Sequence, residues 1–400
     1  DPGSAVKELL SAARAALYEG RWAWATVAAK LAVNAADRTG IRSAQVDARE
    51  RLAESLLENE RRAEAMAVLN GVQGIGHIDR LSRARVQVLR ARVHIAGGEL
   101  NTAFGLLQKA HIVFESHRDR DGVIDVLREQ GNIYRMQGRP EAAVSVFRNM
   151  IGKVGSNPKR KIRNQVYALG GVVDSLLSAG HIDQVKEYGD RLWRLAYDSG
   201  DTRDIAQATY AVGLIHLAHR DMFWAERHFQ TARALAATLG AARVQISCLN
   251  NLGEVLRHNG DLENAARAYQ QTATLAESRN WKVKAAVARL NLALLGVLQD
   301  QTDVSGTEID HAERLLKDHP HHWAWLFIGL LRALWAAQAE DERACRAWWA
   351  VANERGLERM RAPDLRVPLE RLAEVTRRLQ WDPIFDRAAK LANQLPCPEE

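Results

Sequence analysis

The residues best suited to metal chemistry in this 400-residue sequence form the run Asp318-His319-Pro320-His321-His322. Imidazole and carboxylate groups are common ligands of zinc and related ions. A zinc-binding helix usually presents histidines at positions i and i+4, whereas these are nearly consecutive, and no other residue is placed by spacing to complete four ligands. We interpret the run as a polar loop that caps a helix beginning near Trp323. An enzyme or metal-dependent protein with a site in this C-terminal third is the alternative.

Other catalytic signatures are absent from the sequence. There is no nucleophile elbow, kinase loop or paired-carboxylate motif, and the segment GVQGIGHI at 71–78 lacks the lysine and hydroxyl residue of a phosphate-binding loop. Cys248, Cys345 and Cys397 are too widely separated to indicate a disulfide framework or a thiolate metal site. Catalytic residues that are far apart in the sequence and meet only in the folded protein cannot be recognised from their sequence spacing. The sequence therefore predicts a binding protein, with no enzyme activity and no cofactor.

A self-similar period of about 40 residues runs along the chain. Starting from Gly253, a turn residue follows at +7, a small residue at +12 and an aromatic residue at +16. These are Gly260, Ala265 and Tyr269, and the same offsets from Gly213 give Arg220, Ala225 and Phe229. Intervals close to one period separate ten such turn positions: Gly20, Glu58, Gly98, Gly138, Gly180, Arg220, Gly260, Asp300, Glu340 and Gln380.

The offsets have physical reasons. A glycine after a helix adopts the left-handed conformation that ends the helix without a steric penalty. The anchor glycine and the small residue at +12 allow two helices to approach closely, and the aromatic residue at +16 fills the gap toward the next pair. With 47% hydrophobic residues and only 9 prolines, the chain favours helix throughout. An all-α array of about ten helix pairs accounts for this pattern.

The pattern resembles the tetratricopeptide repeat (TPR) family, whose unit is a shorter helix-turn-helix of about 34 residues. The longer period, and phrases such as LNNLGEVLRHNGDLENAARAY and LNLALLGV, are similar to the arrays of kinesin light chain. They are also similar to C-terminal arrays of bacterial Ser/Thr kinases and STAND-type ATPase regulators. The resemblance implies an all-α, right-handed superhelical solenoid of antiparallel helix pairs, with about ten TPR-like repeats.

We expect one solenoid over residues 1–400, with an N-terminal capping repeat at 1–40 and regular repeats at 41–320. Residues 321–400 form irregular, Trp-rich C-terminal repeats, since six of the 11 tryptophans follow position 322. Adjacent Trp348 and Trp349 cannot both point inward on a helix, so one is either a partner contact or a partly exposed edge of the core. The polar segment 301–310, QTDVSGTEID, predicts a turn longer than its neighbours.

The resemblance also implies a binding surface. In the TPR family the first helix of each pair lines a concave groove, where an asparagine two residues before the anchor glycine hydrogen-bonds to an extended peptide. Asn251 and Asn291 occupy that offset, one period apart. Other inward offsets give the remaining candidate peptide-binding residues: Arg128, Asn132, Arg135, Asn250, Glu254 and Arg257.

Packing does not require Asn250, Asn251, Glu254 or Arg257 in this interpretation, so function is expected to reside in them. Their mixed polarity, with several arginines, suits a peptide that carries acidic side chains. Two alternatives stay open. The candidate residues could be ordinary solvated positions, and Asn251 could instead hold its own helix pair together by a bond across the hairpin.

The charge pattern and the absence of targeting signals limit the kinds of partner that the sequence predicts. The net charge is +6 and the isoelectric point about 9.3, but arginines alternate with acids, which disfavours nucleic-acid binding. No signal segment or membrane-spanning run occurs, so we expect a cytoplasmic protein. The chain begins with Asp rather than Met, which suggests a piece of a multidomain bacterial signalling protein. Its expected partner is a protein or peptide, an upstream domain of the same chain, or a second copy in a homodimer.

Overall fold

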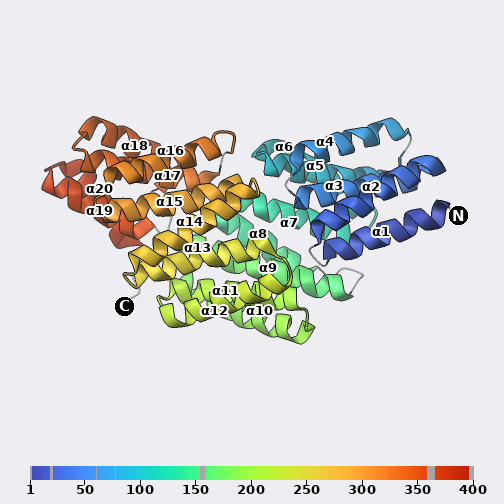
Figure 1. The fold of residues 1–400 in the computed structure, drawn as a ribbon, viewed down its shortest axis with the longest axis horizontal. Coiled ribbons are helices and arrows are strands. Elements are labelled where there is room, and N and C mark those ends of the chain that lie inside the picture. The colour runs from blue at the N-terminus through green and yellow to red at the C-terminus, as the bar shows by residue number, and fades with distance from the viewer. Residues whose placement is uncertain are drawn as a thin grey trace. The chain divides into compact units, whose positions relative to one another are not determined.

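The computed structural model describes residues 2–18, 21–59, 61–76, 78–153, 158–319, 321–357 and 365–395. Every regular element in these ranges is helical, and the helices follow one another in antiparallel pairs (Figure 1). The helices are α1 (Pro2–Tyr18), α2 (Trp22–Thr39), α3 (Arg42–Glu58), α4 (Arg62–Gly71), η1 (Val72–Ile75), α5 (Arg80–Ala96), α6 (Leu100–Ser116), α7 (Arg120–Met136), α8 (Pro140–Gly152), α9 (Pro158–Ser178), η2 (Ile182–Gln184), α10 (Val185–Ser199), α11 (Thr202–Ala218), α12 (Met222–Thr238), α13 (Ala242–His258), α14 (Leu262–Ser278), α15 (Lys282–Leu298), α16 (Thr302–Leu316), α17 (His322–Gln338), α18 (Glu342–Glu354), α19 (Arg366–Arg378) and α20 (Asp382–Gln394).

The chain packs into two compact units. Unit 1 contains residues 1–133, 149–164 and 238–241, and unit 2 contains residues 134–148, 165–237 and 242–400. The predicted all-α architecture of about ten helix pairs is confirmed in the described part of the chain. The predicted division into a capping repeat at 1–40, regular repeats at 41–320 and irregular repeats at 321–400 stays a prediction.

Equal helix lengths produce the constant period of the repeat. Helices α11 to α15 each span 17 residues, and linkers of three residues join them. Two helices and two linkers therefore fill one period. Figure 1 shows α13, α14, α15 and α16 lying side by side as successive members of this series.

Left-handed residues end most of these helices. The predicted turn positions Gly98, Gly138, Gly180 and Gly260 have φ between 66° and 81°. The same conformation occurs without glycine at the other four turn positions that are confirmed: Arg220, Asp300, Glu340 and Gln380. Among the two remaining positions, Gly20 lies outside the described residues. Glu58 differs from the prediction, because it is the last residue of α3 and the following Asn59 has φ −89°.

The turn before α16 is short, which corrects the sequence prediction for 301–310. Asp300 is left-handed and α16 begins at Thr302, so residues 302–310 are helical rather than an extended turn. Gly306 and the polar residues gave the segment the composition of a turn, but Ser305 fits the helix because its hydroxyl donates to the Gln301 carbonyl oxygen at 3.0 Å. The segment 71–76, examined above for a phosphate-binding loop, contains the end of α4, the short η1 and Gly76 at φ 83°.

The glycine and aromatic positions of the repeat pack on each other. A Cβ atom on Gly253 would lie 2.7 Å from the Tyr269 ring of the same helix pair, and Gly213 has the same relation to Phe229. Tyr269 also clusters with Leu295 of the next pair, and the Phe147 ring lies against Gly171 of the next pair. The aromatic residue thus fills two gaps, the predicted one between pairs and another within its own pair.

The tryptophans of the C-terminal helices belong to a large core cluster or pack against it. Trp349 is only 4% exposed, while Trp348 is partly buried and lies under the Arg332 guanidinium, 5.7 Å from its ring centre. Trp323 stacks on Phe327 at 4.9 Å. One of the two adjacent tryptophans points inward, as predicted, and the other forms the edge of the same core.

The register of the repeat can be tested at α14. Ala265 is fully buried, so Ala265→Leu should overpack the hairpin and lower the free energy of unfolding by roughly 1 to 3 kcal/mol. Arg267→Ala is the control, because Arg267 lies on the exposed face and pairs with the exposed Glu263. Urea denaturation measures both, and equal losses would show that the register is wrong.

Candidate functional site

Three successive first helices of unit 2 carry a continuous chain of side-chain hydrogen bonds. The Asn291 amide on α15 donates to Asn250 on α13 at 3.1 Å, and Asn250 donates to the neighbouring Asn251 at 3.4 Å. Asn251 in turn donates to the Tyr210 hydroxyl on α11 at 3.3 Å. We call these four residues, Tyr210, Asn250, Asn251 and Asn291, the amide row.

The repeat itself determines where the amide row begins and ends. Both bonds between helices join residues 41 positions apart, one period plus one residue. The equivalent pairs on either side are Gly170 with Ala211 and Leu290 with Leu331, which carry no side-chain polar group. The row is therefore confined to α11, α13 and α15. Asn291 is 8% exposed, and the other three residues of the row are partly exposed.

Two further polar pairs lie on first helices of unit 2. Lys284 of α15 donates to the Ser247 hydroxyl of α13 at 2.6 Å. Arg135 of α7 forms an ion pair with Asp174 of α9 at 2.8 Å. Burial is the largest effect on Lys284 and lowers its pKa to about 8, with Arg243 adding to the shift. Burial likewise raises the pKa of the Tyr210 hydroxyl, so that group stays protonated at neutral pH.

Glu254 and Arg257, expected to be free of any packing role, are needed by the fold. They form a salt bridge within α13 in which the side chains are 12% and 6% exposed. His258 lies 3.2 Å from the same carboxylate, and the Tyr269 hydroxyl of α14 donates to it at 2.9 Å. Despite its burial, Glu254 has a pKa below the usual range, because Arg257 and His258 favour its ionised form. The expectation failed because a buried aromatic hydroxyl at +16 needs a polar partner.

The remaining predicted residues lie on α7. Arg128 donates to the Asn164 side chain at 2.5 Å, and Asn132 donates to Glu129 at 3.4 Å, both within unit 1. Arg135 belongs to unit 2 and pairs with Asp174, as described above. The prediction that Arg128, Asn132 and Arg135 contact a peptide stays a prediction, as it does for Glu254 and Arg257. In the structure, each of the three makes a polar contact within the protein.

Sequence reasoning missed four residues of this surface: Tyr210, Asp174, Ser247 and Lys284. Tyr210 could have been found, since it lies one period before Asn250 at the same offset. Lys284 and Ser247 are 37 positions apart, one period less about one helical turn, and only the packing of α13 against α15 brings them together. The alternative that Asn251 bonds across its own hairpin is wrong, because its partners are Asn250 and Tyr210 of the preceding pair.

The histidine run caps α17, as the sequence interpretation predicts. His321 precedes the helix, and its Nδ1 accepts from the Ala324 amide at 3.3 Å. The Trp325 indole donates to the His319 carbonyl oxygen at 3.0 Å. Burial, and then Arg135 and the neighbouring histidines, lower the pKa of His321 to about 4. Among described residues, which exclude Pro320, no three His, Cys, Asp or Glu side chains are grouped to hold a metal ion.

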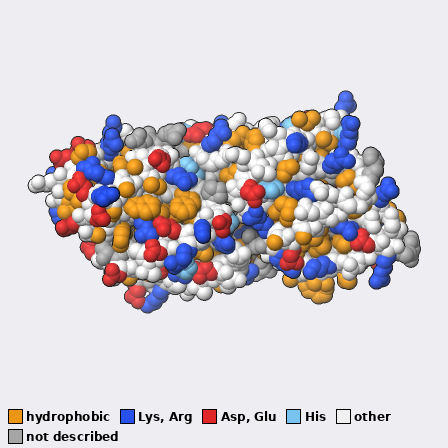
Figure 2. Space-filling view, turned by 90° about the horizontal axis from the view of Figure 1, so that it is seen from above, with side chains coloured by type: hydrophobic (Ala, Val, Ile, Leu, Met, Phe, Trp, Pro, Cys, Tyr) orange, Lys and Arg blue, Asp and Glu red, His pale blue; other side chains and the backbone are white. Residues whose placement is uncertain are grey.

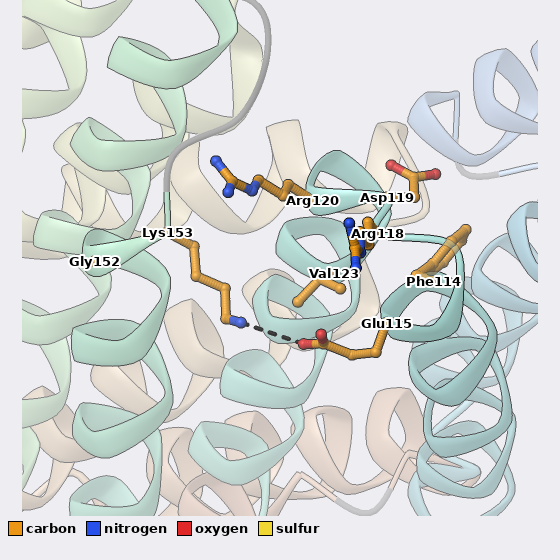
Figure 3. A pocket seen from close by; sticks show the side chains of 8 residues that line it. All are labelled: Phe114, Glu115, Arg118, Asp119, Arg120, Val123, Gly152 and Lys153. Carbon is orange, nitrogen blue, oxygen red and sulfur yellow. Dashed lines mark hydrogen bonds and ion pairs between the residues drawn. The ribbon is translucent and has the colours of Figure 1, made fainter.

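A second candidate is an open pocket in unit 1, between the end of α6, the start of α7 and the end of α8 (Figure 3). The two acidic residues that line the pocket interact with neighbouring groups of the protein. Glu115 and Lys153 point toward one another and form an ion pair at 3.2 Å, and Asp119 accepts from the Gly122 amide at the start of α7. Arg118, which also lines the pocket, is the left-handed residue of the turn. This crevice is formed by the turn between two helix pairs, a feature that recurs along the repeat. The amide row instead needs matching polar side chains on three helices, and we therefore favour it as the candidate site.

The surface carries charges of both signs. In Figure 2, Lys and Arg side chains are interspersed with Asp and Glu over the face shown. No described helix has the length and apolar character needed to cross a membrane.

Comparisons with known proteins establish the kind of fold. No protein-family model and no curated relative matches the sequence. The chain is similar to the solved structure of a Rap protein complexed with competence and sporulation factor, with TM-score 0.62 and 14% identity over 88% of this chain and 99% of that one. It is also similar to the Rap conjugation gene regulator of plasmid pLS20 in complex with the Phr* peptide, with TM-score 0.59 and 13% identity over 86% and 93% of the two chains.

A third similar structure is NprR in complex with its cognate peptide NprX, with TM-score 0.55 and 12% identity over 87% of this chain and 96% of that one. At these identities the likeness shows a shared fold of TPR-like helical repeats. The predicted repeat architecture is confirmed at that level.

The internal role of Arg257 gives a stability prediction. Arg257→Met leaves the Glu254 carboxylate buried without its main partner, so the free energy of unfolding should fall by roughly 3 kcal/mol or more at pH 7. The pKa of Glu254 is lowered in the folded state, so the stabilisation is present above its unfolded pKa, near 4.5, and is lost as the pH falls below that value. The difference between wild type and variant should therefore shrink below pH 4.5 in urea titrations. A neutral effect at pH 7 would contradict the assignment.

Proposed function

We propose that this chain is an interaction module, a scaffold or sensor, that binds an extended peptide along the amide row of unit 2. The amide row carries this proposal. Three side-chain amides and a hydroxyl lie on consecutive first helices and are bonded to one another, and all but the buried Asn291 belong to partly exposed residues. An asparagine amide has two donor hydrogens and an acceptor oxygen, so each amide keeps hydrogen-bonding capacity beyond the bonds within the row.

The dimensions of helix packing suit an extended ligand. Packed helices lie about 8 to 10 Å apart, so α11, α13 and α15 span roughly 20 Å. An extended chain covers this distance with about six residues at about 3.3 Å each. Backbone amide and carbonyl groups of such a peptide present alternating donors and acceptors, which side-chain amides match on both counts. We therefore propose a contact segment of about six residues.

The comparisons support the peptide class of ligand. All three similar structures described above are complexes, two with a named peptide and one with competence and sporulation factor. The proposal transfers only the class, and the residues assigned to it come from this chain. Among the predicted residues, Asn250, Asn251 and Asn291 are retained in the row. Arg135 is proposed as a neighbour of the ligand through its pair with Asp174.

We further propose that the chain acts by binding rather than by catalysis, in the cytoplasm, as a part of a larger signalling protein. The use of His321 as a helix cap weakens the metal-dependent alternative, because its Nδ1 already accepts a backbone hydrogen bond. An upstream domain or a second copy of the chain could present the bound segment in place of a free peptide, since the chemistry of an extended backbone is the same.

Removal of two amides tests the assignment. A pool of synthetic N-acetylated octapeptides with randomised sequences is selected on immobilised protein, and the affinity of a recovered peptide is measured by fluorescence anisotropy. Asn251→Ala combined with Asn291→Ala should weaken binding roughly 30-fold, since each lost amide contributes about 1 kcal/mol. Helicity and melting temperature are measured on the same samples and should change little.

Gln270→Ala with Gln271→Ala is the matched control, because both amides are exposed on the second helix α14. This control should bind as the wild type does. If the double asparagine variant retains full affinity, or if the pool yields no binder, the amide row is not a peptide site.

A further inference from the structure

The cation beside the amide row has a neutral partner. Lys284 donates to the Ser247 hydroxyl, and within the described residues no carboxylate lies within ion-pair distance of its ammonium group. Several other cations of unit 2 are neutralised: Arg135 pairs with Asp174, Arg289 with Glu277 and Glu308, and Arg332 with Asp310 and Glu313. Lys284 therefore differs from them as a partly buried cation whose hydrogen-bond partner is uncharged.

The position of Lys284 connects it to the amide row. On α15 it lies seven residues before Asn291, which places the two side chains on the same face two turns apart. On α13, Ser247 lies three and four residues before Asn250 and Asn251, again on one face. The pair Lys284–Ser247 is thus a second bridge between the same two helices, displaced toward their N-terminal ends from the bridge Asn291–Asn250.

The surroundings disfavour the charge on Lys284 while its partner is a neutral hydroxyl. Burial has the largest effect on its pKa, and the positive charges of Arg243 and Arg135 lower it further, against the opposing influence of Asp174 and Cys248. The resulting pKa is about 8, below that of an ordinary lysine. Bringing a carboxylate to the ammonium group would reverse this shift, because an opposite charge favours the ionised form.

We propose that Lys284 and Ser247 form a carboxylate subsite at the end of the amide row, so that the ligand is a peptide carrying a carboxylate one to two residues beyond the segment held by the amides. This inference rests on the proposed function. The carboxylate belongs either to an Asp or Glu side chain or to the C-terminus of the peptide. One ammonium and one hydroxyl match the single negative charge and the acceptor oxygens of such a group.

The test uses the peptide recovered from the randomised pool and its carboxamide analogues. In one analogue each Asp or Glu is replaced by Asn or Gln, and in another the free C-terminus is amidated. Loss of the essential carboxylate should weaken binding to the wild type about 10- to 100-fold, the range for a charged hydrogen bond. The analogue that shows this loss identifies whether the group is a side chain or the chain terminus.

Two variants assign the effect to the subsite. With Lys284→Met the carboxylate and carboxamide peptides should bind within about 3-fold of each other, which is less than the wild-type difference. Ser247→Ala provides a second, milder change that should weaken the carboxylate peptide a few-fold and leave the carboxamide unaffected. Lys282→Met is the control on the same helix, and it should retain the wild-type discrimination.

The pH dependence of peptide affinity gives a further test, because a lysine with a purely structural role would not affect it. Affinity for the carboxylate peptide should fall as the pH rises from 7 to 9.5, because Lys284 loses its proton, while Lys284→Met should show no such trend. The charged and titratable groups that face Lys284 are Arg243, Arg135, Asp174 and Cys248, and burial raises the pKa of the Cys248 thiol to about 12, above the range of this series.

The possible failures are distinguishable. If the asparagine variant loses binding but the wild type binds carboxylate and carboxamide peptides equally, the subsite is overturned and the peptide groove stands. The subsite is also overturned if discrimination persists in Lys284→Met. If no peptide is recovered at all, the groove and the subsite fall together.

Discussion

The left-handed residue that ends a helix is the constraint on which the structure depends. It reverses the chain in three residues, so helices of equal length follow one another and the repeat keeps a constant period. At Gly260 this conformation is free of steric cost, whereas at Arg220 and Asp300 it carries the penalty of a side chain in the left-handed region. Packing of each 17-residue helix against its neighbours therefore has to hold those turns in place.

Constant period brings polar side chains into register. Residues 41 positions apart on neighbouring first helices face each other, which is how Tyr210 meets Asn251 and Asn250 meets Asn291. In the structure these groups hydrogen-bond to one another. A peptide backbone would exchange such bonds for its own, so each amide would contribute only about 1 kcal/mol to binding. The rest of the affinity would come from charge and from apolar contacts, while the amides also determine the path of the ligand.

Much of the fold was accessible from sequence, because turns and small residues at fixed offsets have purely local causes. Gly98 and Gly260, and even the non-glycine turn at Arg220, occur where the period predicts. The site was less accessible. Glu254 and Arg257 look like surface residues in the sequence, and only the arrival of the Tyr269 hydroxyl from α14 shows that they are a buried pair. Lys284 could not be recognised for a similar reason, because only the structure shows that its partner on α13 is the uncharged Ser247 hydroxyl.

Three-residue linkers between helices of fixed length also limit how such a chain can change during evolution. A single residue inserted within α15 before Asn291 would rotate the two sides of the insertion by about 100° relative to each other, and Asn291 would lose its alignment with Asn250. Insertions of whole helix pairs before α13 or after α15, or changes in the irregular segment 72–76 outside the repeat turns, leave that alignment intact. Divergence of the array is therefore expected by duplication and loss of complete helix pairs rather than by gradual lengthening.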